Sequence, residues 1–312
     1  MTLAFLFPGQ GAQRPGMLHN LPDTPATAAV LSQSRRICDE LGLPAELDTP
    51  RALRDTVATQ VSLVIAGVGC ARGLVADAGL APEVVAGHSV GAFAAAVIAG
   101  VLTLREALVA VHLRGESMRV ACADGGWGMA AVTGLPVRTV QELAQRVTTP
   151  AEPLWVANIN SATQTVLGGT VTALRAAHDA AGRAGATAFD RLDIAVASHG
   201  PVQKNTARTL RDHLATLPHR TPATGYITNT GGRSVATADA ILDDLASSSA
   251  HPVRWYDGMR LMAERGIRCT IETSPGHTLT RLIGSVAPQI TALSVDLDGP
   301  AIVAARAKRL SG

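Results

Sequence analysis

Apolar residues follow two alternating patterns along this chain. Short and nearly unbroken apolar runs, such as Thr2–Phe7, predict buried strands, whereas apolar residues at every third or fourth position predict helices. The second pattern covers about Thr24–Leu41, Thr59–Gly79 and Leu104–Met118. Because strands and helices alternate in this way, we expect an α/β fold with a parallel sheet.

The middle of the chain predicts a separate small unit. Its expected elements run in the order β-α-β-β-α-β, which is the ferredoxin-like unit. The strands are expected at Met129–Thr133, Leu154–Ile159, Thr163–Leu167 and Thr187–Leu192, and the helices at Val137–Val147 and Val171–Ala184. We therefore expect a small domain at 126–196, inserted into a larger domain formed by 1–125 and 197–312. Asn158 and Asn160 fall at the predicted hairpin, where asparagine usually serves turn geometry.

The last third of the chain returns to the α/β pattern. Strands are expected at 226–228, 269–272 and 291–295, and helices at 238–247, at 253–265, from His277 onward and at the C-terminus. The chain has no internal repeat, low-complexity tract or block of like charges. The larger domain therefore draws its sheet from both ends of the sequence.

Composition narrows the class of function. The 312 residues carry a formal net charge of +2, with 17% charged and 3% aromatic residues, so we expect neither a nucleic-acid partner nor a membrane surface. The four cysteines are far apart and predict buried thiols, with no metal site and no disulfide framework. We identify no signal peptide and no apolar stretch of membrane-spanning length, which favours a cytoplasmic enzyme.

One stretch carries a recognisable chemical pattern. Residues 83–96 predict a short strand, a sharp turn and a helix rich in small residues, with Ser89 between Gly87 and Gly91 in the pattern G-x-S-x-G. A serine on such an elbow projects its hydroxyl near the N-terminus of the following helix. The pattern also arises by chance, but the apolar run before it and the alanine-rich helix after it favour a nucleophilic Ser89.

Other polar residues remain open to two interpretations. Arg114 lies on the helix at 104–118 among alanines and Met118, where it needs an anion, a salt bridge or a route to solvent. Gln60 opens a predicted helix and is either a capping residue or part of a site. His199 precedes a helix that begins at Pro201, and a lone loop histidine is usually a surface residue. The glycines at 9–11 resemble a dinucleotide fingerprint, but Arg14 stands where its third glycine belongs.

Taken in order, these segments resemble the malonyl-CoA:acyl-carrier-protein transacylase family over nearly the whole chain. The segments that carry the resemblance are Phe7–Gln13, Thr59-Gln60, Gly87–Gly91, Leu113–Gly115, Val156–Ser161, Ser198-His199, Pro252–Trp255 and Glu272–Gly276. The resemblance implies an α/β-hydrolase-like large domain with a parallel sheet and an inserted ferredoxin-like domain. It also implies an acyltransferase that needs no bound cofactor and takes malonyl-CoA and an acyl carrier protein as partners.

Within this family the chain is most similar to the epsilon subunit of bacterial malonate decarboxylase. The similar stretches are Gly16–Pro22, Ala52–Gln60 and Gly91–Val97, and Ala92-Phe93 stands where fatty-acid enzymes usually have Glu-Tyr. His251 also replaces their usual asparagine before Pro252. This resemblance implies a carrier with a phosphoribosyl-dephospho-CoA arm and other malonate decarboxylase subunits as partners, whereas the fatty-acid branch implies a phosphopantetheine arm.

The resemblance implies a role for each matching residue. Ser89 would form a malonyl ester, His199 would act as general base and acid, and Arg114 would clamp the malonyl carboxylate. The oxyanion hole would be formed by the backbone N–H groups of Gln10 and Val90. The supporting residues would be Gln60, Asn160, His88 and Ser248. Ser248 stands where the family has a glutamine whose backbone carbonyl orients the histidine.

Three alternatives remain beside the malonate decarboxylase hypothesis. A fatty-acid malonyl-CoA:ACP transacylase would use the same chemistry with another carrier. A serine thioesterase or hydrolase would use the same elbow, although no clear acid lies between Ser89 and His199 in hydrolase order. A non-catalytic assembly subunit would have no use for the Ser89, His199 and Arg114 set.

Overall fold

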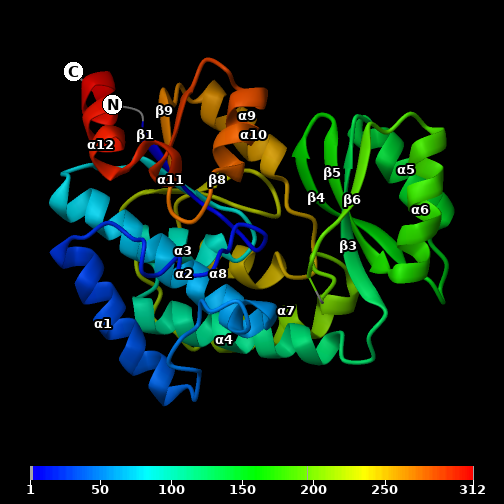
Figure 1. Ribbon diagram of the computed structural model, residues 1–312, viewed down its shortest axis with the longest axis horizontal. Helices are drawn as coiled ribbons and strands as arrows, with labels where there is room; N and C mark the ends of the chain where they lie inside the picture. Colours follow the sequence, from blue (N-terminus) through cyan, green and yellow to red (C-terminus); the bar gives the residue numbers. More distant parts are fainter. Residues whose placement is uncertain (1–2, 195, 312) are drawn as a thin grey trace.

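The computed structural model describes residues 3–194 and 196–311, and Figure 1 shows two sheets, each with its own helices. The predicted strand Thr2–Phe7 is β1, which spans Leu3–Phe7, and Thr2 lies outside the described residues. The α/β class with an added ferredoxin-like unit is confirmed. The division into 1–125 with 197–312 and 126–196 stays a proposal, and Met1, Thr2, Ala195 and Gly312 in those ranges are outside the described residues.

The large sheet has six strands in the order β10-β9-β1-β2-β7-β8. All neighbours are parallel except β7 and β8, which are antiparallel. Its strands after β1 are β2 (Val84–Gly87), β7 (Gly225–Ile227), β8 (Ser234–Val235), β9 (Cys269–Glu272) and β10 (Thr291–Ser294). Parallel strands buried on both faces are expected to be continuously apolar, which explains the runs in the sequence.

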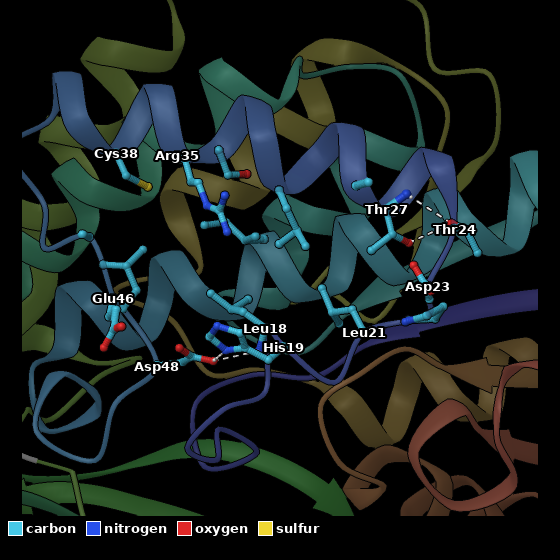
Figure 2. A pocket seen from close by; sticks show the side chains of 17 residues that line it. Leu18, His19, Leu21, Asp23, Thr24, Thr27, Arg35, Cys38, Glu46 and Asp48 are labelled. Atoms are coloured by element: carbon cyan, nitrogen blue, oxygen red, sulfur yellow. Dashed lines mark hydrogen bonds and ion pairs between the residues drawn. The ribbon is translucent and has the colours of Figure 1, made fainter.

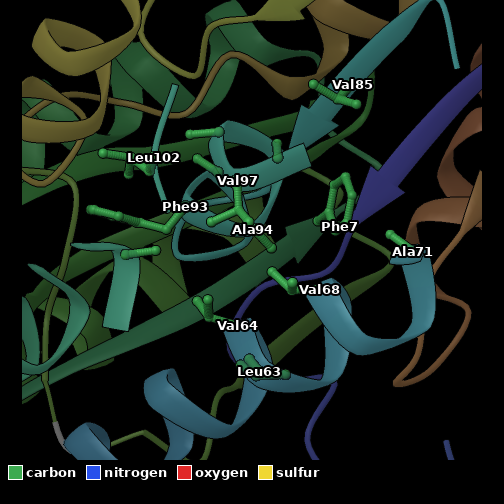
Figure 3. Close-up of a cluster of buried hydrophobic side chains, with 14 of the residues drawn as sticks. Phe7, Leu63, Val64, Val68, Ala71, Val85, Phe93, Ala94, Val97 and Leu102 are labelled. Atoms are coloured by element: carbon green, nitrogen blue, oxygen red, sulfur yellow. The ribbon is translucent and has the colours of Figure 1, made fainter. Parts of the chain in front are cut away.

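Alternate residues of β1 face two different helix layers. Leu3, Phe5 and Phe7 belong to the larger apolar cluster, and Figure 3 shows Phe7 packed beside Val68. The helices of that side are α1 (Pro25–Glu40), α2 (Thr56–Arg72), α3 (Gly91–Ile98), α4 (Leu104–Ala121), α7 (Lys204–Leu214) and α8 (Ala238–Ser247). Ala4 and Leu6 pack on the other side, in the cluster of α9 (Trp255–Glu264) and α10 (Thr278–Val286).

The C-terminal helices and three short turns complete the part of the chain that surrounds the large sheet. The C-terminal helices are α11 (Val295–Asp298) and α12 (Pro300–Ser311). Two 3-10 turns lie at Ala52–Arg54 and Pro201–Gln203, and a π-helical turn at Gly73–Asp77 extends α2.

The helix at α2 corrects two expectations. It begins at Thr56 rather than Thr59, because the Asp55 side chain accepts the Ala58 N–H at 2.9 Å and caps the helix. With its π-helical extension it forms a predominantly apolar helix of 22 residues, Thr56–Asp77, which is long and apolar enough to cross a membrane. The expectation that no stretch reaches that length was therefore wrong. The most apolar 18-residue window of this helix is 94% buried inside the protein, as is typical of a core helix.

The second sheet is antiparallel, with the order β4-β5-β3-β6. Its strands are β3 (Trp127–Thr133), β4 (Leu154–Ser161), β5 (Gln164–Thr170) and β6 (Ala188–Arg191), and its helices are α5 (Val137–Val147) and α6 (Val171–Arg183). The two helices cover one face of this sheet, on the far right of Figure 1. The β-α-β-β-α-β order of the ferredoxin-like unit is therefore confirmed.

The hairpin between β4 and β5 differs from the prediction. Asn158 and Asn160 lie within β4, not at the turn, because the strand extends to Ser161, with one register shift between Val156 and Asn158 and a second between Ile159 and Ser161. Strand β4 also pairs with the chain before α9, since Ile159 N–H donates to Val253 O at 2.8 Å and Val253 N–H to Ala157 O at 2.9 Å. Helix α9 consequently starts after Val253, later than predicted. These bonds fix the small sheet against the large one.

Candidate active site

Ser89 lies on a sharp turn between β2 and α3. Its φ is +54°, a left-handed conformation that a serine rarely adopts. The turn is tight, because a Cβ on Gly87 would lie 2.1 Å from the Gly91 carbonyl carbon, and one on Gly91 would lie 2.2 Å from Phe7 O. Glycine is therefore required at both positions of the G-x-S-x-G pattern.

His199 lies directly beside Ser89, so the loop histidine is not a surface residue. Its Nε2 is 2.7 Å from Ser89 Oγ, and its side chain is buried. Nδ1 is 2.6 Å from the backbone carbonyl of Ser248. A carbonyl only accepts, so Nδ1 carries the hydrogen and Nε2 is free to accept from the serine hydroxyl. His199 also has a positive φ of +60°, and its N–H donates to Ser249 O at 2.9 Å.

Arg114 reaches the same serine from α4. Its Nη2 donates to Ser89 Oγ at 3.1 Å, and its Nη1 donates to Gln60 Oε1. The side chain is only 2% exposed and has no carboxylate partner anywhere in residues 3–194 or 196–311. Its Nε has no hydrogen-bond partner either. A buried guanidinium without a counterion is costly unless an anionic ligand occupies the site.

Gln60 and Gln10 extend this polar chain. Gln60 is fully buried, and its Nε2 donates to Thr56 Oγ1 at 3.1 Å; Thr56 Oγ1 in turn is 3.5 Å from Gln10 Oε1. The backbone N–H groups of Gln10 and Val90 donate to no acceptor within the described chain. Both amides are therefore available to a ligand oxygen, one on the loop after β1 and one at the start of α3.

His88 connects the elbow to the small sheet. Its Nε2 is 3.1 Å from Asn160 Oδ1 and 3.2 Å from Asn158 Nδ2, so both asparagines of β4 face this histidine. Its ring contacts Trp255 edge-on, with 5.4 Å between centroids. Burial lowers the pKa of His88, which keeps the ring neutral, although the bond to Asn160 opposes this. The contact to His88 explains why β4 carries asparagines where strand propensity disfavours them.

Three of the neighbours of the site were missed in the sequence. Asn229 contacts the backbone on both sides of the elbow, Asp244 holds Asn229, and Trp155 Nε1 donates to Ser198 O at 3.0 Å. Of these three, only Asn229 could have been found from the sequence. It directly follows the predicted strand at 226–228, and ligands of α/β proteins bind at the carboxyl ends of such strands.

Most of the site residues line a cleft of about 450 Å³ between the two sheets, although Gln60, Val90 and Ser248 are not among its lining residues. Its walls include Ser89, His199 and Arg114 from the large unit and Asn160 from the small one. A larger cavity of about 720 Å³ lies elsewhere, between α1 and α2, where Leu18, Leu21 and Thr27 face it in Figure 2. None of the predicted site residues lines that cavity.

The electrostatics of the cleft set the protonation of His199. Burial, and then the charge of Arg114, lower its pKa to about 3, although the carbonyl of Ser248 opposes them. Burial lowers the pKa of Arg114 to about 10, which still leaves it charged at neutral pH. The cleft therefore holds a neutral base, a hydroxyl within its reach and a fixed positive charge, which suits attack on an acyl group that carries an anion.

Comparisons with known proteins agree with this geometry. The chain is 31% identical over 304 residues to the malonyl CoA-acyl carrier protein transacylase of Escherichia coli strain K12, with 97% of each chain covered. The solved transacylase of that name from Coxiella burnetii superimposes with a TM-score of 0.91 at 30% identity, covering 100% of this chain and 98% of that one.

A malonyl-transacylase solved in complex with a type II polyketide acyl-carrier protein superimposes with a TM-score of 0.89 at 30% identity. The superposition covers 98% of this chain and all of that one. Residues 4–293 match the family described as the acyl transferase domain. This match spans both sheets and every residue of the cleft described above. The chain is a member of the acyl transferase domain family.

Proposed function

We propose that this protein is a malonyl-CoA:acyl-carrier-protein S-malonyltransferase. The observation that carries the proposal is Arg114, a buried cation that has no counterion among the described residues and whose Nη2 is 3.1 Å from Ser89 Oγ. In a malonyl ester of Ser89 the carboxylate carbon is three bonds from Oγ, which is within reach of that guanidinium. The planar fork of arginine binds a carboxylate through two parallel hydrogen bonds. An acetyl group offers nothing for it to bind.

The first half of the reaction acylates the serine. Ser89 Oγ attacks the thioester carbonyl while Nε2 of His199 takes its proton, as the 2.7 Å distance between them allows. The free N–H groups of Gln10 and Val90 are the proposed donors to the oxyanion. The C–S bond then breaks, and the imidazolium returns the proton to the thiolate of CoA.

The second half repeats these steps with another thiol. The thiol of the carrier arm gives its proton to His199 and attacks the ester carbonyl, and the Ser89 alkoxide leaves and recovers that proton. The carbonyl of Ser248 keeps the imidazole in the required tautomer during both halves. The net reaction exchanges one thioester for another, so it needs no cofactor or metal.

The malonate decarboxylase branch is the weaker of the two malonyl hypotheses. The relatives reported above are named for transfer to acyl carrier protein. Most of the substitutions that favoured the decarboxylase lie away from the cleft, because Ala92 and Phe93 are buried in α3 and His251 lines a separate surface hollow. Ser248 contacts His199, but only through its backbone carbonyl, which any residue supplies. We therefore favour a carrier with a phosphopantetheine arm over a phosphoribosyl-dephospho-CoA arm.

Two other hypotheses lose support in the cleft. A thioesterase would use water as its second nucleophile and would gain nothing from Arg114. An assembly subunit would carry the desolvation cost of a buried arginine without benefit. A cytoplasmic location stays a proposal.

The test is a two-step assay with a mass readout. Incubation with malonyl-CoA alone should add one malonyl group to the protein, and holo acyl carrier protein should then remove it. Ser89→Ala should show neither step. A stable adduct on Ser89→Ala, or an adduct that no carrier protein can accept, would contradict the proposed function.

A further inference from the structure

Asn229 holds the backbone on both sides of the nucleophile. Its Oδ1 accepts the N–H of Ser89 at 2.9 Å, and its Nδ2 donates to the carbonyl of Gly87 at 2.9 Å. The side chain is only 3% exposed, and it lies just beyond the end of β7, the neighbour of β2 in the sheet. A single amide therefore binds the last residue of β2 and the serine itself.

The turn that Asn229 binds is strained. Ser89 has a φ of +54°, and such a conformation persists in a non-glycine residue only where the surrounding structure enforces it. The glycines at 87 and 91 permit the close approach of the chain but do not hold it there. The two bonds from Asn229 supply that constraint, since they satisfy the amide and the carbonyl that would otherwise pull the turn toward a relaxed form.

Asp244 in turn anchors Asn229. Its Oδ2 accepts the backbone N–H of Asn229 at 2.9 Å, and its Oδ1 accepts the N–H and the hydroxyl of Thr230 at 2.9 and 2.7 Å. The hydroxyl of Tyr226 lies 3.3 Å from Oδ2. The carboxylate is 2% exposed, and burial raises its pKa while the bonds from Thr230 and Asn229 lower it. Four donors thus fix one side chain of α8.

The same helix end orients the base. Ser248 follows Asp244 by one helical turn and donates its N–H to Asp244 O at 2.9 Å. The carbonyl of Ser248 accepts from Nδ1 of His199 at 2.6 Å, and the carbonyl of Ser249 accepts the N–H of His199 at 2.9 Å. The last turn of α8 therefore contacts the base directly and the nucleophile through Asp244 and Asn229.

We propose that Asn229 is a positioning residue that fixes the Ser89 turn to α8, so that one helix sets the distance between the nucleophile and the base. The proposal rests on the proposed function, in which Ser89 is the nucleophile. Misplacement of a reacting group by about 1 Å can cost roughly 10²-fold in rate. Asn229 does not contact Arg114 and does not itself line the cleft, so its loss should affect the rate of acylation far more than substrate binding.

The test compares Asn229→Ala with a matched control, Thr228→Val. The control removes the bond from Thr228 Oγ1 to the carbonyl of Arg233 at 3.2 Å, which involves neither the elbow nor Asp244. We expect Asn229→Ala to slow malonylation of Ser89 by at least about 10-fold, with the KM for malonyl-CoA changed less than about 3-fold. Thr228→Val should lower Tm while its rate stays within about 2-fold of wild type.

Equal rates for Asn229→Ala and Thr228→Val, at matched losses of Tm, would overturn the proposal and leave Asn229 as a purely structural residue. Asn229→Asp guards against a variant that does not fold. Its carboxylate still accepts the Ser89 N–H but cannot donate to Gly87 O, so we expect a loss of at least about 3-fold, and a wild-type rate would also overturn the proposal. Ser89→Ala, assayed in parallel, separates the two failures. An adduct on that variant shows that the proposed function itself has failed, whereas equal rates without such an adduct overturn the role of Asn229 alone.

Discussion

Removal of Arg114 should change which acyl group the protein accepts. The guanidinium donates to Ser89 Oγ and Gln60 Oε1, and no carboxylate of the described chain competes for it. In the proposed malonyl complex it turns two N–H groups to the carboxylate. Arg114→Ala would leave that carboxylate in a partly desolvated cleft with no cation to pair with.

The magnitude follows from the strength of the lost bonds. A hydrogen bond to a charged group contributes roughly 1.5–3 kcal/mol, and the fork makes two of them. Even a net loss of about 3 kcal/mol corresponds to roughly 10²-fold in kcat/KM. We therefore expect malonyl transfer to fall at least ~10²-fold, while acetyl transfer changes less than about 3-fold because acetyl makes neither bond.

The assay measures kcat/KM for malonyl-CoA and acetyl-CoA with one holo carrier protein. Arg105→Ala is a matched control, since Arg105 lies on the same helix, is exposed and pairs with Glu40. It should leave the ratio of malonyl to acetyl kcat/KM unchanged. Arg114→Lys should recover only part of the ratio, because a point charge cannot form the fork. A ratio that Arg114→Ala does not move would refute the carboxylate clamp and leave Arg114 as a structural cation.

Three further outcomes are expected. The pKa of His199 in the folded protein is about 3, against an ordinary value of 6.5. As pH falls, the unfolded chain therefore binds a proton at this group before the folded protein does. This difference should lower the free energy of unfolding by about 2 kcal/mol between pH 6.5 and 5. Urea unfolding of His199→Gln should show a shallower pH slope there, and an equal slope would contradict the lowered pKa. Since the charge of Arg114 lowers the pKa of His199, Arg114→Ala should move the acid limb of its acetyl-transfer profile to higher pH, and no movement would contradict that coupling. Gln60→Ala should raise the KM for malonyl-CoA several-fold but leave acetyl-CoA unaffected, since Gln60 holds Arg114; equal losses for both would count against this role.

The sequence predicts the fold correctly wherever a local pattern of residues is compatible with only one type of secondary structure. The apolar run of β1 and the G-x-S-x-G turn each predict their element, because burial on both faces and a tight turn demand those residues. The hairpin of β4 and β5 was predicted at the wrong residues, because its asparagines contact His88, which is distant in the sequence, rather than forming the turn. Tertiary contacts of that kind leave no trace in local propensity.

The site residues also differ in whether the sequence could reveal them. The resemblance brought Ser89, His199 and Arg114 forward by motif, and the structure brings all three together in one cleft. Motifs did not reveal Asn229 or Asp244, since the bonds of Asn229 to the elbow run to backbone groups 140 or more residues away. A side chain that binds backbone groups requires no particular residue type in its partner, so no sequence motif reveals the contact. Such support is visible only once the strands are placed side by side.

The partner of His199 fits the chemistry of thioester exchange. Its Nδ1 faces the carbonyl of Ser248, where serine hydrolases place a carboxylate. A carboxylate there would stabilise the imidazolium, but in this small buried cleft it would also attract Arg114 and compete with the malonyl group. The neutral carbonyl fixes the tautomer without that competition. The resulting weak base suffices, because the leaving group of the first half and the nucleophile of the second half are both thiols, which ionise at about pH 8.5. A malonyl carboxylate on Arg114 would also offset the charge that depresses the pKa of His199, so the base should gain strength when the correct acyl group is bound.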